Sequence, residues 1–213
     1  GSFKQGGVVY GLWNVLSKQW VHTGAAGYAD VASKVAWTKE TLSRIGSVTK
    51  VFPTLMAYQL VDAGVLNLDE PLSSIVPFTV AGGNADQVTF RAMLGQVSGL
   101  QRESPLGNTD PNITLPDVLK SLQSMRLLFR SYERPSYSNL AYALVGRTLE
   151  GVVGSTFEDY CLAKIFAPLQ MSNTGFNCTP DVVSRMAFGY APNGAAARPG
   201  DILTFTAPAG QAY

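Results

Sequence analysis

A serine and a lysine three residues apart are the first side chains in this sequence whose types and spacing could do chemistry. Ser47 and Lys50 lie in the phrase RIGSVTKVF, residues 44–52. Residues three positions apart share one face of a helix, so this hydroxyl and this amine can touch. A serine hydroxyl is a poor nucleophile until a base takes its proton, and a lysine can be that base when its surroundings lower its pKa. The bare pattern is common, and a surface helix with serine as its cap is the ordinary structural interpretation.

A tyrosine and an asparagine form a second candidate pair further along the chain. Tyr137 and Asn139 stand in the phrase PSYSN, residues 135–139, directly before a helical pattern. Residues two apart in an extended segment point to the same side. A tyrosine near a lysine could carry a proton to and from the nucleophile, and an asparagine amide could hold a substrate carbonyl. Taken alone, the pattern also fits a turn in which Asn139 caps the following helix.

Taken together, these phrases resemble the serine β-lactamase and penicillin-binding-protein superfamily, on the side of class C enzymes and their esterase-like relatives. The order and spacing of the matching phrases fit that family across nearly the whole chain. The matching phrases cover residues 44–52, 96–100, 135–146 and 150–174.

The resemblance implies a role for each of the four side chains. Ser47 would be the acylated nucleophile and Lys50 its partner at the base of the site. Tyr137 would be the shared proton carrier, and Asn139 would orient the substrate. The implied activity is that of a serine hydrolase, acting through an acyl-enzyme on an amide, lactam or ester. The substrate would be a small molecule or peptide with a reactive carbonyl, and no cofactor is implied. The Tyr-x-Asn form resembles class C enzymes, DD-peptidases and carboxylesterases rather than class A enzymes.

The sequence departs from the family pattern at three places. The superfamily has a third motif, Lys/His-x-Gly, whose strand supplies an oxyanion donor, and no such triplet follows Asn139. Relatives usually carry histidine where this chain has Gln96, a position that is mostly structural. Pro53 is also unusual, and it predicts a kink or an early restart of the helix that carries Lys50.

The missing third motif leads to three expectations. The chain is expected to be the N-terminal portion of a longer protein, poorly active alone, with a complementing C-terminal segment as a possible partner. Its first strands are expected to expose apolar surface. Two other functions stay open, namely a catalytically silent protein used in binding or assembly, and a penicillin-binding sensor that acylates without turnover.

Composition excludes several other classes of protein. Hydrophobic residues make up 46% of the 213 residues and charged residues 15%, which is typical of a globular chain. The net charge of +1, with acids and bases interspersed, gives no support for a nucleic-acid partner. No apolar run reaches roughly 18 residues, so no membrane span is predicted. An extracytoplasmic location is favoured only by the resemblance, because many relatives are exported.

The chain has too few suitable ligands to predict a metal site. Cys161 and Cys178 are its only cysteines and His22 its only histidine. Cys161 falls in a helical pattern and is interpreted as a small core residue, although one bridge to Cys178 is possible. His22 is interpreted as a structural or surface residue in a strand.

The pattern of elements predicts an α+β fold, in which strands come first and a long helical section follows. Two strands alone are too few for a stable sheet, so further strands should complete it. By resemblance this is the β-lactamase/transpeptidase-like fold, a sheet flanked by helices plus an all-helical lobe, truncated before its C-terminal strands. One incomplete domain is predicted, with its parts at residues 1–64, 65–185 and 186–213. The segment 24–30 is interpreted as a glycine-rich exit from the second strand. The predicted strands are residues 7–13 and 20–24, and the predicted helices cover residues 47–62, 89–96, 139–150 and segments beginning at 114 and 155.

Overall fold

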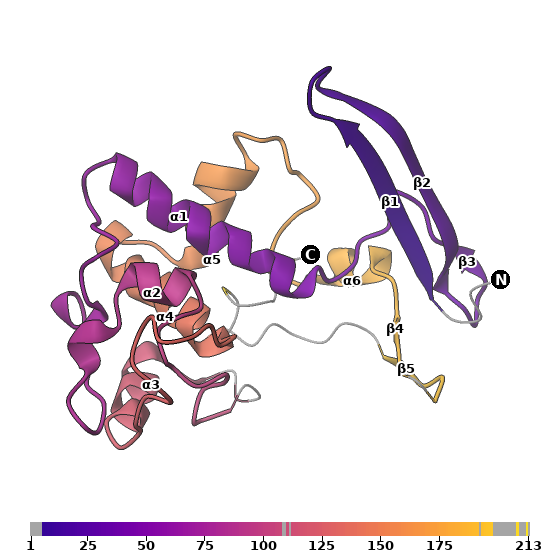
Figure 1. Ribbon diagram of the computed structural model, residues 1–213. Coiled ribbons are helices and arrows are strands. Elements are labelled where there is room, and N and C mark those ends of the chain that lie inside the picture. Colours follow the sequence, from indigo (N-terminus) through magenta and orange to yellow (C-terminus); the bar gives the residue numbers. More distant parts are fainter. Residues whose placement is uncertain are drawn as a thin grey trace. The chain divides into compact units, whose positions relative to one another are not determined.

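A computed structural model describes residues 6–107, 110, 112–191, 193–197, 208 and 212 of the chain. The fold divides into two compact units, and each is described by itself (Figure 1). The first consists of Gly1–Arg44 and Asn177–Asp201, and the second of Ile45–Phe176 and Ile202–Tyr213. Strands lie in the first unit and the longer helices in the second, which confirms the α+β class. The subdivision at residues 64 and 185 stays a prediction.

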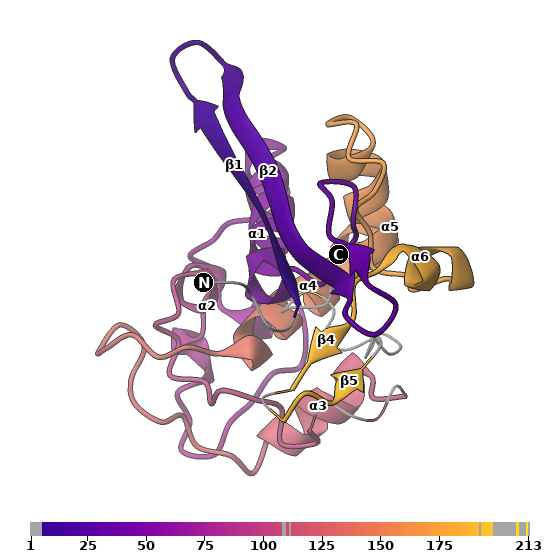
Figure 2. The same ribbon diagram turned by 90° about the vertical axis from the view of Figure 1, so that its right-hand side faces the viewer.

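A long antiparallel hairpin dominates the first unit. Strand β1, Gly7–Asn14, pairs with β2, Gln19–Asp30, and β2 pairs with the short β3, Val35–Ala36, in the order β1-β2-β3. Figure 2 shows the two long strands side by side. The Asn14 side chain closes the turn, since its Oδ1 accepts the N–H groups of Leu16 and Ser17 at 2.9 and 3.0 Å.

The second strand is longer than the sequence pattern predicts. Residues 24–30, interpreted as a glycine-rich exit, instead continue β2, so that prediction was wrong. Gly27 explains why glycine suits a strand here: its φ is +88°, and a Cβ would lie 2.5 Å from the Gly6 carbonyl oxygen. The glycines therefore permit a close approach of β1 to β2.

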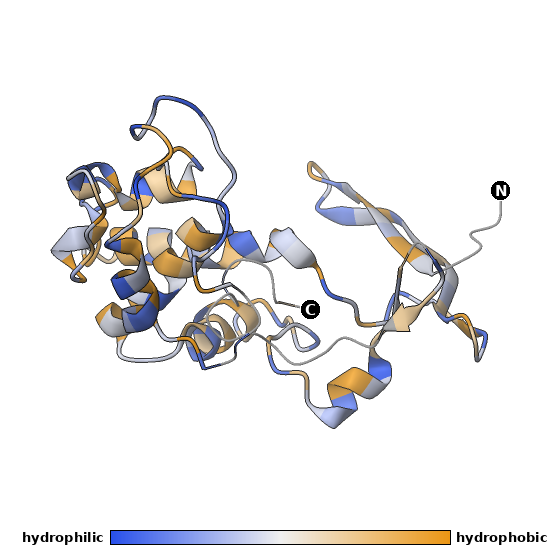
Figure 3. Ribbon diagram, turned by 90° about the horizontal axis from the view of Figure 1, so that it is seen from below, coloured by the Kyte–Doolittle hydropathy of each residue, from blue (hydrophilic) through white to orange (hydrophobic). Residues whose placement is uncertain are grey.

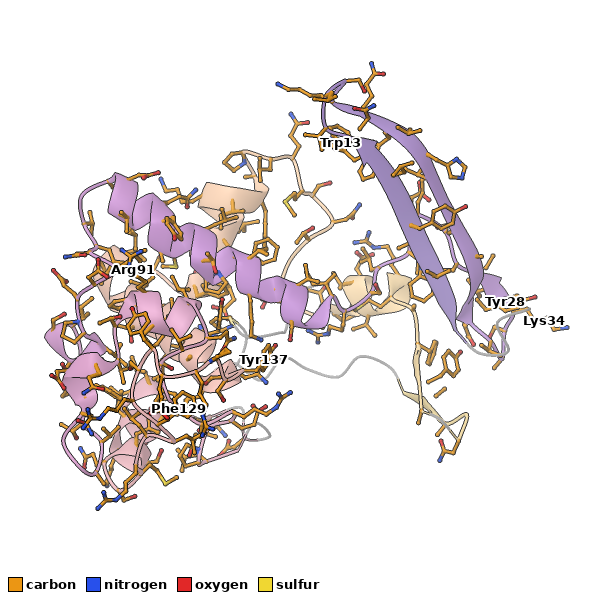
Figure 4. All side chains as sticks on the ribbon, in the orientation of Figure 1. Trp13, Tyr28, Lys34, Arg91, Phe129 and Tyr137 are labelled. Carbon is orange, nitrogen blue, oxygen red and sulfur yellow. The ribbon has the colours of Figure 1, made fainter. Side chains whose placement is uncertain are left out.

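The hairpin exposes large hydrophobic side chains, as the sequence leads one to expect. Leu16 is 95% exposed at the turn, and Trp20 is 62% exposed. Trp13 lies toward the turn end of the hairpin (Figure 4) and contacts Trp20 edge to face, with ring centroids 5.2 Å apart. These aromatic rings shield each other only partly from solvent.

A short helix and a two-stranded sheet complete the described part of the first unit. Strands β4, Gly189–Tyr190, and β5, Ala196–Ala197, form an antiparallel pair. Helix α6, Pro180–Arg185, was not predicted, although the Thr179 side chain caps it and proline stands in its first turn. With only six residues it is too short to show a helical spacing of apolar positions.

In the second unit, the helix that follows Ser47 has two parts. A 3-10 helix, η1, spans Gly46–Lys50, and the α-helix α1 begins directly after it and spans Val51–Asp62. Pro53 therefore stands in the first turn of α1, where its missing N–H costs no hydrogen bond. The expectation of an early helix restart is confirmed.

The remaining helices lie close to their predicted positions, but two of their N-terminal caps differ from the predicted ones. Ser138 caps helix α4, Asn139–Val153, by accepting the Ala141 N–H at 3.0 Å, so the interpretation of Asn139 as the cap was wrong. Thr156, with Asp159, caps helix α5, Phe157–Cys161, one residue later than the sequence pattern predicts. The other helices of the unit are η2 Leu72–Ser74, η3 Ala85–Gln87, α2 Phe90–Leu94, α3 Leu115–Leu122, α4 Asn139–Val153, α5 Phe157–Cys161 and a π-helical turn Leu162–Phe166.

One hydrophobic core holds the second unit together around α4. Leu144 and Leu149 of α4 are fully buried, and so are Met56 of α1 and Phe90 of α2. The helices carry hydrophobic and hydrophilic residues along the same ribbons (Figure 3), which is typical of helices that cover a core on one side. Because α1 and α4 both pack into this core, the segments at their N-terminal ends are fixed relative to each other.

Candidate active site

The candidate nucleophile lies on the 3-10 helix at the start of α1. Gly46, with φ of +53°, turns the chain into η1, a conformation that glycine adopts without strain. The residues on both sides of Ser47 are tied to Ala212: the Ile45 N–H donates to the Ala212 carbonyl, and the Ala212 N–H donates to the Thr49 side-chain Oγ1, each at 3.1 Å. The Ser47 side chain itself stays exposed.

The structure brings the four predicted site residues together. Ser47 Oγ lies 2.5 Å from the Tyr137 hydroxyl oxygen, and Lys50 Nζ donates to Ser47 Oγ at 3.3 Å. The same Lys50 ammonium donates to Asn139 Oδ1 at 2.7 Å. Lys50 is only 8% exposed, so its charge is compensated by these oxygens rather than by bulk water.

Charge around Tyr137 favours its ionised form. Desolvation of the phenol acts to raise its pKa, but hydrogen bonds from Lys50 and Ser47 and the positive charges of Lys50 and Arg102 outweigh it. The pKa of Tyr137 therefore lies below its usual value. The Lys50 ammonium also lies 4.7 Å from the Tyr137 ring centroid, and the Arg102 guanidinium lies 4.9 Å from it. Tyr137 in this position loses its own proton more readily than a tyrosine in water, and the resulting phenolate can accept the proton of Ser47.

Gln96 holds the segment that carries Tyr137. Its carbonyl accepts the Ser136 N–H at 2.7 Å, and its Oε1 accepts the Ser138 N–H at 2.6 Å. Gln96 has a φ of +59°, an unusual backbone conformation for a residue other than glycine. These two hydrogen bonds hold the residues on either side of Tyr137, and one of them uses the side chain of Gln96.

Comparison with known proteins identifies the family. The family model described as Beta-lactamase matches residues 5–211. The chain belongs to the β-lactamase family. It is 35% identical over 187 residues to Beta-lactamase-like protein 2 of Dictyostelium discoideum, an alignment that covers 83% of this chain and 34% of that protein. It is 31% identical over 184 residues to human Putative beta-lactamase-like 1, which covers 81% of this chain and 36% of that protein.

A solved β-lactamase shares the fold. The crystal structure of a class C β-lactamase from Rhodobacter sphaeroides aligns with a TM-score of 0.77 at 26% identity and covers 97% of this chain. The alignment covers 56% of that structure. The resemblance to the serine β-lactamase and penicillin-binding-protein superfamily is confirmed, and so is its fold. The chain spans about one third of the length of the curated relatives just named.

Two residues that contact the predicted site residues were not themselves predicted. Arg102 lies over the Tyr137 ring, and Glu103 Oε1 accepts a hydrogen bond from Asn139 Nδ2 at 2.7 Å. Both belong to the loop after Ser98 and Gly99, which has no helical or strand spacing. No sequence pattern points to their contact with residues far along the chain.

The histidine and the two cysteines form neither a metal site nor a disulfide among the described residues. Among them, no group of three His, Cys, Asp or Glu side chains could hold a metal ion. His22 lies exposed on β2, with Nε2 3.3 Å from the Tyr10 hydroxyl. Cys161 and Cys178 are both free, so the possible bridge between them is not formed. A search of the described residues finds no helix long and apolar enough to cross a membrane.

Proposed function

We propose that this chain carries the acylation site of a serine hydrolase, with Ser47 as its nucleophile. The observation that carries the proposal is the position of Ser47 Oγ, 2.5 Å from the Tyr137 hydroxyl and 3.3 Å from Lys50 Nζ. A hydroxyl beside a tyrosine whose ionised form is favoured can lose its proton as it attacks, whereas a serine with no base beside it cannot. Membership of the β-lactamase family supports the same assignment.

In the proposed acylation step, Ser47 Oγ attacks the carbonyl carbon of an amide, lactam or ester. Its proton passes to the Tyr137–Lys50 pair, and the C–O bond to Ser47 forms as the carbonyl becomes a tetrahedral oxyanion. When the oxyanion collapses, the bond to the leaving nitrogen or oxygen breaks and the pair returns the proton to that atom. Water then attacks the acyl-enzyme by the same route in reverse and releases the acid.

Asn139 and the start of η1 are proposed to position the substrate. The Asn139 amide, held next to Lys50, can hydrogen-bond a polar group of the substrate beside the scissile bond. The Ser47 backbone N–H, in the first turn of η1, is proposed as one oxyanion donor. A second donor would come from the family's third motif, which this sequence lacks after Asn139.

Acylation by these 213 residues alone is therefore expected to be slow. Loss of one oxyanion donor costs roughly 3 kcal/mol of transition-state stabilisation. A complementing C-terminal segment that carries the third motif is proposed as a partner that would raise the rate. The substrate class remains a small molecule or peptide with a reactive carbonyl.

The proposal is tested by labelling with a fluorescent penicillin and by turnover of p-nitrophenyl acetate. Ser47→Ala should abolish covalent labelling, whereas Ser17→Ala, in the exposed turn of the hairpin, should leave it unchanged. Mass spectrometry of the labelled protein should place the acyl group on Ser47. Stable stoichiometric labelling without turnover would point instead to an acylation sensor. Absence of any reaction, also with downstream sequence of a β-lactamase relative supplied, would contradict the enzyme proposal and favour a silent binding protein.

A further inference from the structure

The amide of Asn139 is held at both of its polar atoms by groups of opposite character. Lys50 Nζ donates to its Oδ1 at 2.7 Å, and its Nδ2 donates to Glu103 Oε1 at 2.7 Å. An ammonium can only donate and an ionised carboxylate can only accept. Only one of the two orientations of the amide satisfies both partners, so the chemistry of the neighbours fixes which atom faces Lys50.

The backbone next to Glu103 is fastened to the start of α4. The Arg102 carbonyl accepts the N–H groups of Asn139 and Leu140 at 2.8 and 3.2 Å. The Ser138 hydroxyl, which also caps α4, donates to the Gln101 carbonyl at 2.7 Å. These hydrogen bonds fix the backbone before Glu103 against the start of α4. The position of Glu103 beside Asn139 therefore does not depend on the side-chain contact alone.

We propose that Glu103 is a positioning residue for the acylation site, because its carboxylate keeps Asn139 Oδ1 directed at Lys50. The inference rests on the proposed function of Ser47 and Lys50. During acylation the proton of Ser47 passes to the Tyr137–Lys50 pair, so the hydrogen bond from Lys50 to Asn139 Oδ1 joins Asn139 to a group that takes part in the reaction. The hydrogen bond from Asn139 Nδ2 to Glu103 Oε1 does not involve Lys50 or Tyr137. Glu103 therefore holds the amide in place throughout the cycle.

The first test compares acylation by three variants, measured as the second-order rate constant for a fluorescent penicillin. Glu103→Ala removes the acceptor, and we expect a loss of roughly tenfold, as for a hydrogen bond to a charged group. Glu103→Gln keeps a side chain of the same length that ends in an acceptor oxygen. Its acylation rate should lie within about threefold of the wild-type rate. Glu103 forms an ion pair with its preceding cation, Arg102, at 3.3 Å. Glu40→Ala is the matched control, since Glu40 pairs in the same way with its preceding cation, Lys39, at 3.8 Å. It should leave the rate unchanged.

A double-variant comparison separates positioning from a general loss of structure. In an Asn139→Ala background, Glu103→Ala should cause no further loss, because the group that it positions is already absent. An equal loss in both backgrounds would overturn the proposal. So would a wild-type rate in Glu103→Ala, or a rate in Glu103→Gln as low as in Glu103→Ala.

A second readout does not depend on activity. The side-chain amide signals of Asn139 in an NMR spectrum can be assigned by their loss in Asn139→Ala. In Glu103→Ala these signals should shift and exchange faster with solvent, whereas in Glu40→Ala they should not move. If the wild-type protein is not labelled at all, the proposed function fails, and these signals alone decide whether Glu103 positions the amide. Unchanged signals in Glu103→Ala would overturn the inference.

Discussion

Among the individual residues of the site, Tyr137 determines how the acylation rate should depend on pH. Its pKa lies below the ordinary value of 10.0, because hydrogen bonds and nearby positive charges outweigh the effect of burial. Since phenolate accepts a proton and phenol does not, the rate of acylation should rise with pH, and the midpoint of the rise should lie below the ordinary pKa of 10.0. Tyr137→Phe should remove this rise and lower the rate by about a hundredfold or more. The measurement is the rate of penicillin labelling as a function of pH.

Tyr132→Phe is the control for that profile. Tyr132 is 56% exposed, and its hydroxyl lies 3.4 Å from Thr89 Oγ1, away from Ser47. This variant should keep the wild-type curve. A Tyr137→Phe enzyme that retained the same pH dependence would show that another group accepts the proton.

The site could be predicted from sequence as far as its residues belong to motifs. Their spacings allow Ser47 and Lys50, and likewise Tyr137 and Asn139, to act on one side of an element. Their proposed roles come from the resemblance of the surrounding phrases to the serine β-lactamase superfamily. Glu103 could not be found in this way. Its contact with Asn139 depends on how a loop is folded against α4, and neither residue type nor spacing encodes that approach.

Between elements of the second unit, an ion-pair cluster joins α4 to α5. Arg147 of α4 pairs with Glu150 at 2.5 Å and with Glu158 of α5 at 2.6 Å, and its side chain is only 10% exposed. Arg147→Leu should therefore lower the free energy of unfolding by about 3–5 kcal/mol, since it leaves two carboxylates in a poorly solvated place. Urea denaturation followed by circular dichroism measures this loss.

An exposed ion pair gives the matched comparison. Arg91 and Asp69 also form a close pair, at 2.6 Å, but both side chains are more than half exposed. Arg91→Leu should cost less than about 1 kcal/mol. Equal losses in the two variants would mean that burial does not set the strength of the Arg147 cluster.

The sequence predicted elements better than it predicted their ends. Helix α4 was found because its apolar positions repeat at helical spacing and Gly154, in the left-handed conformation, ends it. The cap of α5 was placed one residue early because Ser155 and Thr156 are both suitable caps. The extension of β2 was missed because glycine usually weakens a strand, and here it is tolerated because β1 passes close by.

Across the whole molecule, the two free cysteines should report separately on the two units. Cys161 is fully buried in the core of the second unit, and burial raises the pKa of its thiol well above the usual value. Cys178 belongs to the first unit, is partly exposed, and accepts a hydrogen bond from Arg44 at 3.1 Å. Because the thiolate is the reactive form, native Cys161 should react with iodoacetamide only when the second unit opens, whereas Cys178 should react directly.

Mass spectrometry after timed alkylation measures this difference. The native protein should take up one label quickly and the second only in denaturant, and Cys178→Ser should abolish the fast label. Substrate-like ligands that bind at Ser47 should slow the second label further, since they stabilise the folded second unit by mass action. Two fast labels would contradict a closed core around Cys161. No label even in denaturant would indicate a disulfide that the structure does not contain.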